Sequence, residues 1–318
     1  MNHIEMLLAA ILLDALFGDP ARLWSRIPHP VALAGRIIAR ADDRFNRGRH
    51  RALRGGILVA LLALAAAAAG GLVAMIPDHG LLEAAGAAIL IAHGSLMRRL
   101  WAVRRGFAEG IEAARGAVAR LTARDIHDLD ESGVARAAIE AGAEGFLDDL
   151  VAPAFWFLLL GLPGLAVYRV VQTADSLIGH VDERHVDFGR FAAALKHRMG
   201  WIPARIAGGL IMIAALRQSA GDVMLSDASL HVTPNSGWPE AAMAGALGIA
   251  TSGPRVYDGE VTDDPWINGR ARRVLTQRDL RRAIWLLWRA WGVLVLILAG
   301  VAWLTWDWSA GTLPAAAG

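Results

Sequence analysis

Long apolar runs separated by charged segments dominate the chain and predict membrane-spanning helices. Residues 55–76 form the clearest run, with 22 residues that carry no charge and are rich in alanine and glycine. A transmembrane helix needs about 17–25 apolar residues, so this run is long enough to cross a bilayer. Residues 81–96, interrupted by His93, predict a return span. Residues 284–306 predict a last span, with tryptophans at both ends as is typical of membrane interfaces.

Three other apolar stretches are less regular. Residues 4–17 are short for a span and carry Asp14. They lack a basic leader and a small-residue cleavage site, which favours an uncleaved first helix. Residues 150–171 and 202–216 are interrupted by prolines and contain Arg169 and Arg205. These two stretches either cross the membrane twice or form re-entrant segments, and their broken pattern favours the re-entrant alternative.

The polar segments set the expected topology and fold class. Residues 22–54 hold nine arginines and two acids, which indicates the cytoplasmic side. Residues 98–149 predict a cytoplasmic helical insertion, and residues 217–283 a second cytoplasmic loop. The chain is therefore expected to be an all-α, polytopic integral membrane protein, a single domain over residues 1–318 in the inner (cytoplasmic) membrane. About 4–6 membrane segments are expected, some short or re-entrant.

Composition agrees with this class and excludes several functions. Hydrophobic residues make up 55% of the chain, and the net charge of +2 does not suggest a nucleic-acid partner. The absence of cysteine removes disulfides, thiolate metal sites and cysteine nucleophiles. No glycine-rich loop ends in Gly-Lys-Ser/Thr, so a P-loop ATPase is disfavoured. Lys196 is the single lysine of the chain.

Glu140, Glu144 and Asp148 recur at i, i+4 and i+8 in the predicted insertion. This spacing places three carboxylates on one helical stripe. Such spacing is more often a solvated helix face. The alternative is a magnesium site, because hard cations prefer carboxylate oxygens.

A second candidate lies in the stretch Thr233-Pro234-Asn235-Ser236-Gly237-Trp238-Pro239-Glu240, which precedes a run of small residues up to Gly248. The stretch predicts a tight turn followed by a helix that begins near Pro239. The open N–H groups at the start of that helix would attract an anionic oxygen. Taken alone, the stretch is more often an ordinary turn with a tightly packed helix.

Several motifs in this order resemble the CobD/CbiB family of cobalamin biosynthesis. They comprise Asp14-(x)3-Gly18-Asp19-Pro20, Pro28-His29-Pro30-Val31, Ala152-Pro153-(x)2-Trp156, Thr173-Ala174-Asp175-Ser176-Leu177-Ile178-Gly179, Trp201-Ile202-Pro203-Ala204-Arg205 and Pro234-Asn235-Ser236-Gly237-Trp238-Pro239-Glu240 with the small-residue run that follows. The resemblance extends from about residue 7 to residue 269. It implies a membrane-bound adenosylcobinamide-phosphate synthase, which uses ATP and Mg²⁺ to join adenosylcobyric acid to aminopropanol or its phosphate.

The resemblance also implies roles for individual residues. Asn235, Ser236 and Gly237, with Trp238 and Glu240 beside them, would hold an anion of the substrate. Asp14, Asp19, Asp175 with Ser176, and the stripe Glu140, Glu144 and Asp148 are candidates for binding magnesium or orienting the amine. Arg205 would pair with a phosphate or a corrin propionate. His29 is a candidate proton carrier, although a histidine at a bend more often bonds to backbone.

The sequence departs from the family pattern in several acidic segments. The largest departure replaces a Leu-Asp-Asp run by Leu195-Lys196-His197, followed by Gly200 in place of asparagine. Two carboxylates have become basic groups, which weakens any metal site built there. Two alternatives to the ligase therefore stay open: a non-catalytic membrane relative that binds a corrinoid or a partner protein, and a transporter. Expected partners are the corrinoid and amino-alcohol substrates, the lipid bilayer and other late cobalamin-pathway enzymes.

Overall fold

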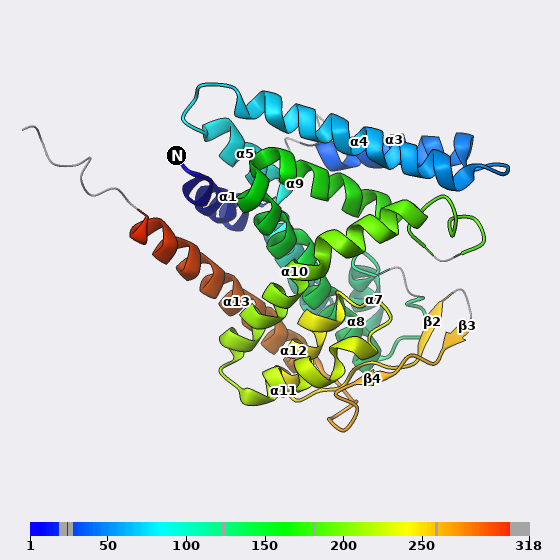
Figure 1. Cartoon of the computed structure of the whole chain (residues 1–318). Coiled ribbons are helices and arrows are strands. Elements are labelled where there is room, and N and C mark those ends of the chain that lie inside the picture. Colours follow the sequence, from blue (N-terminus) through cyan, green and yellow to red (C-terminus); the bar gives the residue numbers. More distant parts are fainter. Residues whose placement is uncertain (19–23, 25–27, 123–124, 181, 258–259, 306–318) are drawn as a thin grey trace, which may run out of the picture.

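The described chain is predominantly helical, as the sequence predicts, with four short strands between its last two helices (Figure 1). The computed structural model describes residues 1–18, 24, 28–122, 125–180, 182–257 and 260–305. The first helices are α1 (His3–Phe17), α3 (Pro30–Phe45), α4 (Arg51–Ala74), α5 (Leu81–Leu90), α6 (His93–Glu109), α7 (Ile111–Val118) and α8 (Glu131–Phe146). They are followed by the π-helix η1 (Leu147–Val151), α9 (Ala152–Ile178), α10 (Arg190–Ala215), α11 (Gln218–Asp227), the 3₁₀ turn η2 (Ala228–Leu230), α12 (Gly237–Leu247) and α13 (Gln277–Leu304).

Four segments of the described chain are long and apolar enough to cross a bilayer. They are Arg51–Ala74, Leu81–Glu109, Glu131–Ile178 and Gln277–Leu304. On α4 the side chains of Leu61, Leu64 and Leu72 are 61–67% exposed, as expected of a helix that faces lipid. The prediction of an all-α polytopic membrane protein is confirmed, and the number of spans lies within the predicted range.

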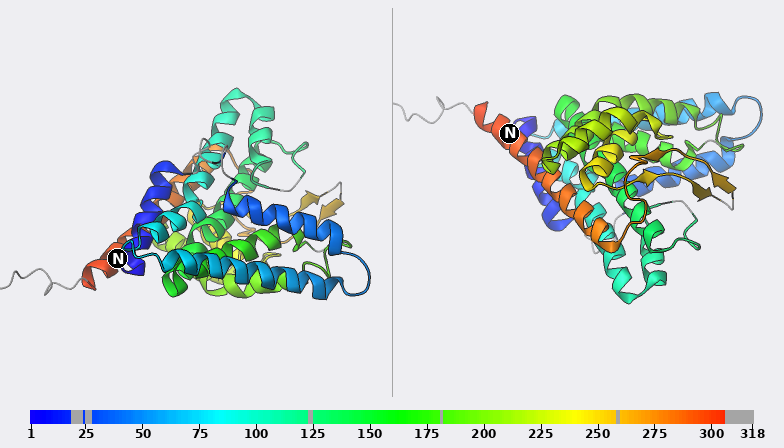
Figure 2. Two further views of the ribbon diagram at one scale, coloured as in Figure 1. Left: turned by 90° about the horizontal axis from the view of Figure 1, so that it is seen from above. Right: turned by 90° about the horizontal axis from the view of Figure 1, so that it is seen from below.

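Small residues let the N-terminal helices pack closely. α3 and α4 lie beside each other and against α9 (Figures 1 and 2). A Cβ at Gly70 of α4 would lie 2.7 Å from the backbone nitrogen of Pro163, and one at Gly55 would lie 1.9 Å from the carbonyl oxygen of Phe188. The glycines of the α4 run therefore set the distance between α4 and its neighbours.

Residues 150–171, expected to be interrupted, form two helical segments that meet inside α9. The backbone leaves the helical conformation at Gly161, where φ is 65° and ψ is −157°. Pro153 is tolerated because it lies in the first turn of α9, where its missing N–H costs little. Pro163 lies two residues after Gly161, near the start of the second segment. The break agrees with the interrupted sequence pattern, and the re-entrant alternative stays a prediction.

The helical insertion predicted over residues 98–149 is helical. α6 and α7 form a hairpin that projects from the body (Figure 2). Gly110, with φ at 121°, makes the turn. α8 then runs without interruption into η1 and α9. Its stripe of carboxylates is thereby carried back towards the membrane segments.

Residues 182–189 link α9 to α10 and are tied to α3. The guanidinium of Arg184 donates to Asp42 Oδ2 at 2.5 Å, and Asn46 Nδ2 donates to Asp42 Oδ1 at 2.8 Å. Burial opposes the ionisation of Asp42, but the hydrogen bonds from Asn46 and Arg184 outweigh it and hold its pKa below the ordinary value.

Residues 217–283 form a compact unit around α12. The predicted helix is present, although it begins at Gly237, two residues before Pro239, and ends at Leu247. Gly248 follows in the left-handed conformation, with φ at 66°. Four short strands, not predicted, make two antiparallel ribbons: β1 (Thr251–Ser252) pairs with β4 (Trp266–Ile267), and β2 (Arg255–Tyr257) with β3 (Glu260–Thr262).

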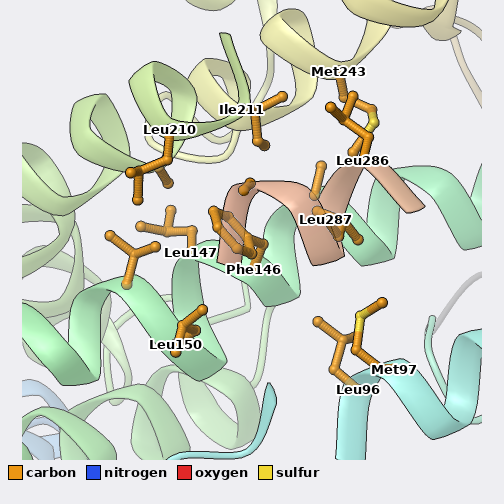
Figure 3. Close-up of a cluster of buried hydrophobic side chains, with 14 of the residues drawn as sticks. Leu96, Met97, Phe146, Leu147, Leu150, Leu210, Ile211, Met243, Leu286 and Leu287 are labelled. Carbon is orange, nitrogen blue, oxygen red and sulfur yellow. The ribbon is translucent and has the colours of Figure 1, made fainter. Parts of the chain in front are cut away.

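The main core lies where α6, η1, α10, α12 and α13 meet the end of α8. Figure 3 shows Phe146 at the centre of this cluster, and its side chain is fully buried. Leu147, Leu210, Ile211, Met243 and Leu287 surround it and are at most 4% exposed. The core fixes the end of α8 against α10, and with it the polar residues described next.

Candidate active site

A polar cavity of about 770 Å³ lies between α8, η1, α9, α10 and the turn before α12. Its wall combines charges of both signs with small residues and amides. The charged members are Arg99, Arg120, Glu144, Asp148, Asp149, Asp175 and Lys196, and the other polar members include Gln172, Ser176, His180, His197, Thr233 and Asn235. We call this space the acidic cavity. Three segments in which the sequence analysis predicted site residues line this cavity, although the three segments lie far apart along the chain.

Lys196 places an ammonium group among the carboxylates. Its Nζ lies 3.1 Å from Asp148 Oδ2 and 4.0 Å from Asp175 Oδ2. The residue is 7% exposed. Burial disfavours the charged form, but attraction by Asp148, Glu144 and Asp175 outweighs it and raises the pKa of Lys196 above its ordinary value. Lys196 is therefore a fixed positive charge and not a nucleophilic amine at neutral pH.

Two consecutive aspartates of η1, Asp148 and Asp149, accept hydrogen bonds from different partners. Asp148 Oδ1 accepts from the hydroxyl of Tyr168 at 2.8 Å. Asp149 accepts from Arg169 at 3.0 Å and from Arg99 at 3.4 Å. The wider turn of a π-helix separates neighbouring side chains differently from an α-helix, and such turns are frequent at functional sites. The result is an alternating arrangement of fixed positive and negative groups along one wall.

The predicted anion cradle at the start of α12 already has protein partners. The N–H groups of Gly237 and Trp238 donate to the carbonyls of Thr233 and Asn235, each at 3.3 Å. Ser236 Oγ donates to Glu144 Oε1 at 3.1 Å. A Cβ at Gly237 would lie 2.0 Å from the carbonyl oxygen of Ala228. The turn is therefore closely packed, and it presents Thr233, Pro234 and Asn235 to the acidic cavity.

Asn235 connects the turn to α10. Its Nδ2 donates to the carbonyl of His197 at 2.8 Å. A Cβ at Gly200 would lie 2.7 Å from the same Nδ2. Gly200, which stands where the resembling family has asparagine, thus makes room for the asparagine of the turn, and Lys196, the other departure, lines the acidic cavity.

A second polar cluster lies behind the turn, and it is buried. Ser252 donates through its backbone N–H to Glu140 Oε1 and through its hydroxyl to Glu240 Oε1, both at 2.7 Å. His231 Nε2 lies 3.1 Å from Glu240 Oε2. Ser252 has a φ of 57°, a left-handed conformation that is strained for serine. Glu140 and Glu240 therefore hold β1 and α12 together and do not line the acidic cavity.

The predicted carboxylate stripe does not form a metal site. Glu140 bonds to Ser252, Glu144 to Ser236, and Asp148 to Tyr168 and Lys196. Within the described ranges, no group of three or more His, Asp or Glu side chains is arranged to hold a metal ion. An ammonium group already lies beside Asp148, where a cation would have to bind, so these residues do not fit a magnesium ion held by the protein.

Other predicted site residues lie outside the acidic cavity. Asp14 is 3% exposed and its Oδ2 accepts from the N–H of Gly94 at 2.9 Å, at the start of α6. His29 accepts from the N–H of Val31 at 3.2 Å at the start of α3, and its Nε2 lies 3.3 Å from the carbonyl of Ile89. Asp19 falls outside the described residues.

Arg205 and Trp238 belong to an aromatic stack. The guanidinium of Arg205 lies 3.8 Å from the ring centroid of Trp201 and 4.4 Å from that of Trp238. Its Nη1 also donates to the carbonyl of Trp201 at 2.6 Å. None of the three lines the acidic cavity. Of the predicted catalytic residues in the described chain, Asp175 and Ser176 are the two that line it.

Several residues of the site were missed from the sequence. Tyr168, Gln172 and Arg99 lie in or beside apolar runs, where their spacing gave no signal. Lys196 was recognised as a change of charge, but its pairing with Asp148 depends on how α10 crosses η1.

Comparison with known proteins identifies the family. The family model described as "CobD/Cbib protein" matches residues 7–287. A "Cobalamin biosynthesis protein CobD" from Brucella suis is 43% identical over 299 residues, which cover 88% of this chain and 90% of the relative.

Proteins of the same name from Rhizobium meliloti and Rhodobacter capsulatus are 38% and 40% identical over 314 residues. These alignments cover 93% and 95% of this chain and 96% and 98% of the relatives. No solved structure matches the chain. The match to the family model over most of the chain and the identity to full-length relatives show that the chain belongs to the CobD/CbiB family.

Proposed function

We propose that this protein is an enzyme that joins adenosylcobyric acid to aminopropanol or its phosphate in an ATP-dependent amide ligation. Its relatives carry the name cobalamin biosynthesis protein, and the chain takes part in cobalamin biosynthesis as a member of their family. The observation that carries the finer proposal is the acidic cavity. Two of the resembling motifs, the one with Asp175 and Ser176 and the one with Pro234 and Asn235, meet there, and its volume lies within the range of small-molecule sites, about 300–1,000 Å³.

The reaction needs both an activated carboxylate and a free amine. A carboxylate resists attack, so transfer of the terminal phosphoryl group of ATP to a propionate oxygen would give an acyl phosphate and ADP. Attack of the amine nitrogen on the acyl carbon would then form the amide, with loss of inorganic phosphate and of one proton from nitrogen. The enzyme must align these groups and stabilise negative charge on the phosphate.

In this proposal, the positive side chains and the negative side chains of the cavity wall have separate roles. Lys196, Arg99 and Arg120 supply positive charge to the phosphate of the acyl phosphate and of the amino alcohol. Asp175 faces the cavity beside Lys196, and it would orient the incoming ammonium and accept its proton. Ser176 and Asn235 would hydrogen-bond the substrate.

Magnesium enters this proposal only with the nucleotide, since the described carboxylates do not fit a metal ion. When bound to ATP, the ion neutralises charge on the phosphates. The remaining tasks fall to the chain's own residues. ATP and corrinoid substrates also favour the cytoplasmic face of the inner membrane as the location of the cavity, close to other late enzymes of the pathway.

Lys196 also favours one alternative function. If its ammonium blocks the amine site, the protein would bind a corrinoid without turning it over. Complementation separates the two functions: a strain that lacks the synthase is given this gene and fed cobyric acid with aminopropanol. The ligase predicts growth on that mixture. Growth only with preformed cobinamide would exclude the ligase and leave the binding protein.

A further inference from the structure

A second cavity, of about 420 Å³, lies at the C-terminal ends of α10 and α12, whereas the acidic cavity is lined by the first half of α10 and the turn before α12. We call it the arginine cavity. It lies between the end of α10, the end of α12 and the first half of α13, and it is lined by Ala215, Arg217, Ala246, Leu247, Arg281, Arg282, Trp285, Leu286 and Arg289. One wall is therefore apolar, and the other carries four guanidinium groups. Nothing in the ligation chemistry above uses them.

Most of this positive charge has no protein counter-ion. Arg282 lies 3.4 Å from Asp279 Oδ1, and that oxygen also accepts from Arg272 at 2.7 Å. For Arg217, Arg281 and Arg289, no ion pair or side-chain hydrogen bond is present within the described part of the chain. Like charges in one cavity repel each other, so a bound anion would stabilise the arrangement.

The charged surface continues past the arginine cavity. A neighbouring cavity of about 430 Å³ is lined by Arg104, Gln277, Arg278 and Arg281, so Arg281 belongs to both. Along α13, Arg281, Trp285 and Arg289 follow one another at i, i+4 and i+8 and share a face. At 1.5 Å per residue, this face runs for about 12 Å along the helix.

The position of the arginine cavity identifies the kind of anion. α13 is a candidate membrane span, and its apolar part begins within the cavity wall. Trp285 is 57% exposed there, as is typical of an aromatic side chain at the headgroup level. A ligand that fits must present phosphate to the arginines and carbon to Ala215, Leu247 and Leu286. A soluble phosphate ester offers little apolar surface, whereas a phospholipid offers both.

We propose that the arginine cavity binds the headgroup of an anionic phospholipid, with its phosphate between Arg217, Arg281 and Arg289. Basic pockets beside transmembrane helices are known to hold such headgroups. The bound lipid would fix the ends of α10 and α12 against α13. Because α10 carries Lys196 and α12 follows the turn with Asn235, the lipid would also hold two walls of the acidic cavity in place.

Native mass spectrometry of the full chain in mild detergent tests this proposal, with phosphatidylglycerol and phosphatidylcholine titrated as probes. The cavity variant is Arg281→Gln with Arg289→Gln. The control variant is Arg190→Gln with Arg198→Gln, two exposed arginines at the same spacing on α10 that line neither cavity. Both variants remove the same charge from exposed positions.

The wild type is expected to prefer phosphatidylglycerol. The cavity variant should bind it about 25-fold more weakly, which corresponds to about 1 kcal/mol for each arginine near an anionic lipid surface. The control variant should change binding less than threefold. Arg217→Gln, which removes the cavity arginine outside α13, should by itself weaken binding about fivefold.

Two outcomes would overturn the proposal. Equal losses in the cavity and control variants would show attraction by overall charge and not by a site. Displacement of the lipid by millimolar glycerol 3-phosphate would assign the cavity to a soluble phosphate ester. The measurement needs no turnover, so its result is independent of whether the ligation activity is present.

Discussion

Replacing Lys196 by methionine removes the ammonium group of the acidic cavity while keeping a side chain of similar length. The wild-type Nζ lies 3.1 Å from Asp148 Oδ2, and the two side chains are 9% and 12% exposed. In the variant, the carboxylate of Asp148 stays enclosed with one hydrogen bond from Tyr168 and no adjacent cation from α10. We expect a loss of stability that is large for a single substitution.

The size of this loss follows from the cost of leaving a buried charge without its partner. Breaking a buried ion pair by removing one partner costs about 3–5 kcal/mol. Because water can enter the cavity, we expect a value at the lower end, about 3 kcal/mol. This corresponds to a fall of roughly 6–9 °C in the unfolding midpoint.

The pH dependence of this difference has a defined sign. Because the pKa of Lys196 is raised in the folded state, its contribution to the free energy of unfolding is complete below the unfolded pKa of about 10.4. That contribution is lost only as pH rises through the higher folded pKa. The wild-type contribution is therefore constant between pH 5 and pH 8. The deficit of Lys196→Met should consequently persist from pH 7 to pH 9, where the wild-type ammonium stays charged.

Thermal unfolding of the purified protein in detergent, followed by intrinsic tryptophan fluorescence, measures this effect. Arg198→Met is the matched control, because Arg198 lies on the same helix, is exposed and loses the same charge. Its midpoint should stay within about 2 °C of the wild type. If Lys196→Met were no less stable than Arg198→Met, or if its deficit disappeared between pH 7 and pH 9, the buried ion cluster would be refuted.

Four further substitutions test other parts of the structure by the same unfolding measurement. Tyr168→Phe removes a hydrogen bond to a buried carboxylate and should cost about 1.5–3 kcal/mol, and no loss would contradict that contact. Gly237→Ala places a Cβ 2.0 Å from a carbonyl oxygen and should cost about 1–3 kcal/mol. Gly116→Ala in α7, with nothing within 4 Å of the added Cβ, should instead stabilise the protein by about 0.5–1 kcal/mol. If Gly237→Ala and Gly116→Ala changed the unfolding free energy equally, the close packing at Gly237 would be wrong. Asp42→Asn should destabilise at pH 7 because the lowered pKa of Asp42 reflects its bonds to Arg184 and neighbours. That contribution to stability is present above the unfolded pKa of about 3.9 and lost as pH falls through the lower folded pKa, so a deficit that grew as the pH fell from 7 would contradict it.

The membrane segments could be predicted because their signal is local. The charge-free run at residues 55–76 and the tryptophan-flanked run at residues 284–306 correspond to α4 and α13, since length and hydrophobicity decide such helices. The helix after Pro234-Asn235 was also predictable from turn and helix-start residues. Its first N–H groups were expected to be open. They bond to the carbonyls of the turn, a detail of backbone geometry that residue types do not specify.

The chemistry of the acidic cavity could be predicted only in part. Asp175 was predicted from a motif, and it lines the cavity as that motif suggests. The stripe Glu140, Glu144 and Asp148 was read as one unit, but its members contact three different elements, because η1 changes the helical turn after Phe146. The position of Lys196 beside Asp148 depends on how two distant helices cross. Sequence spacing carries no information about such a crossing.

The proposed ligation is tested most directly by purified protein in nanodiscs, given ATP, adenosylcobyric acid and aminopropanol phosphate. Products are followed by mass spectrometry, together with release of ADP. The account predicts one ADP for each amide formed, a loss of about 100-fold or more for Asp175→Asn as the proposed proton acceptor, and little change for Asp222→Asn, an exposed carboxylate on α11. Binding of the corrinoid without amide formation, in wild type and variants alike, would contradict it.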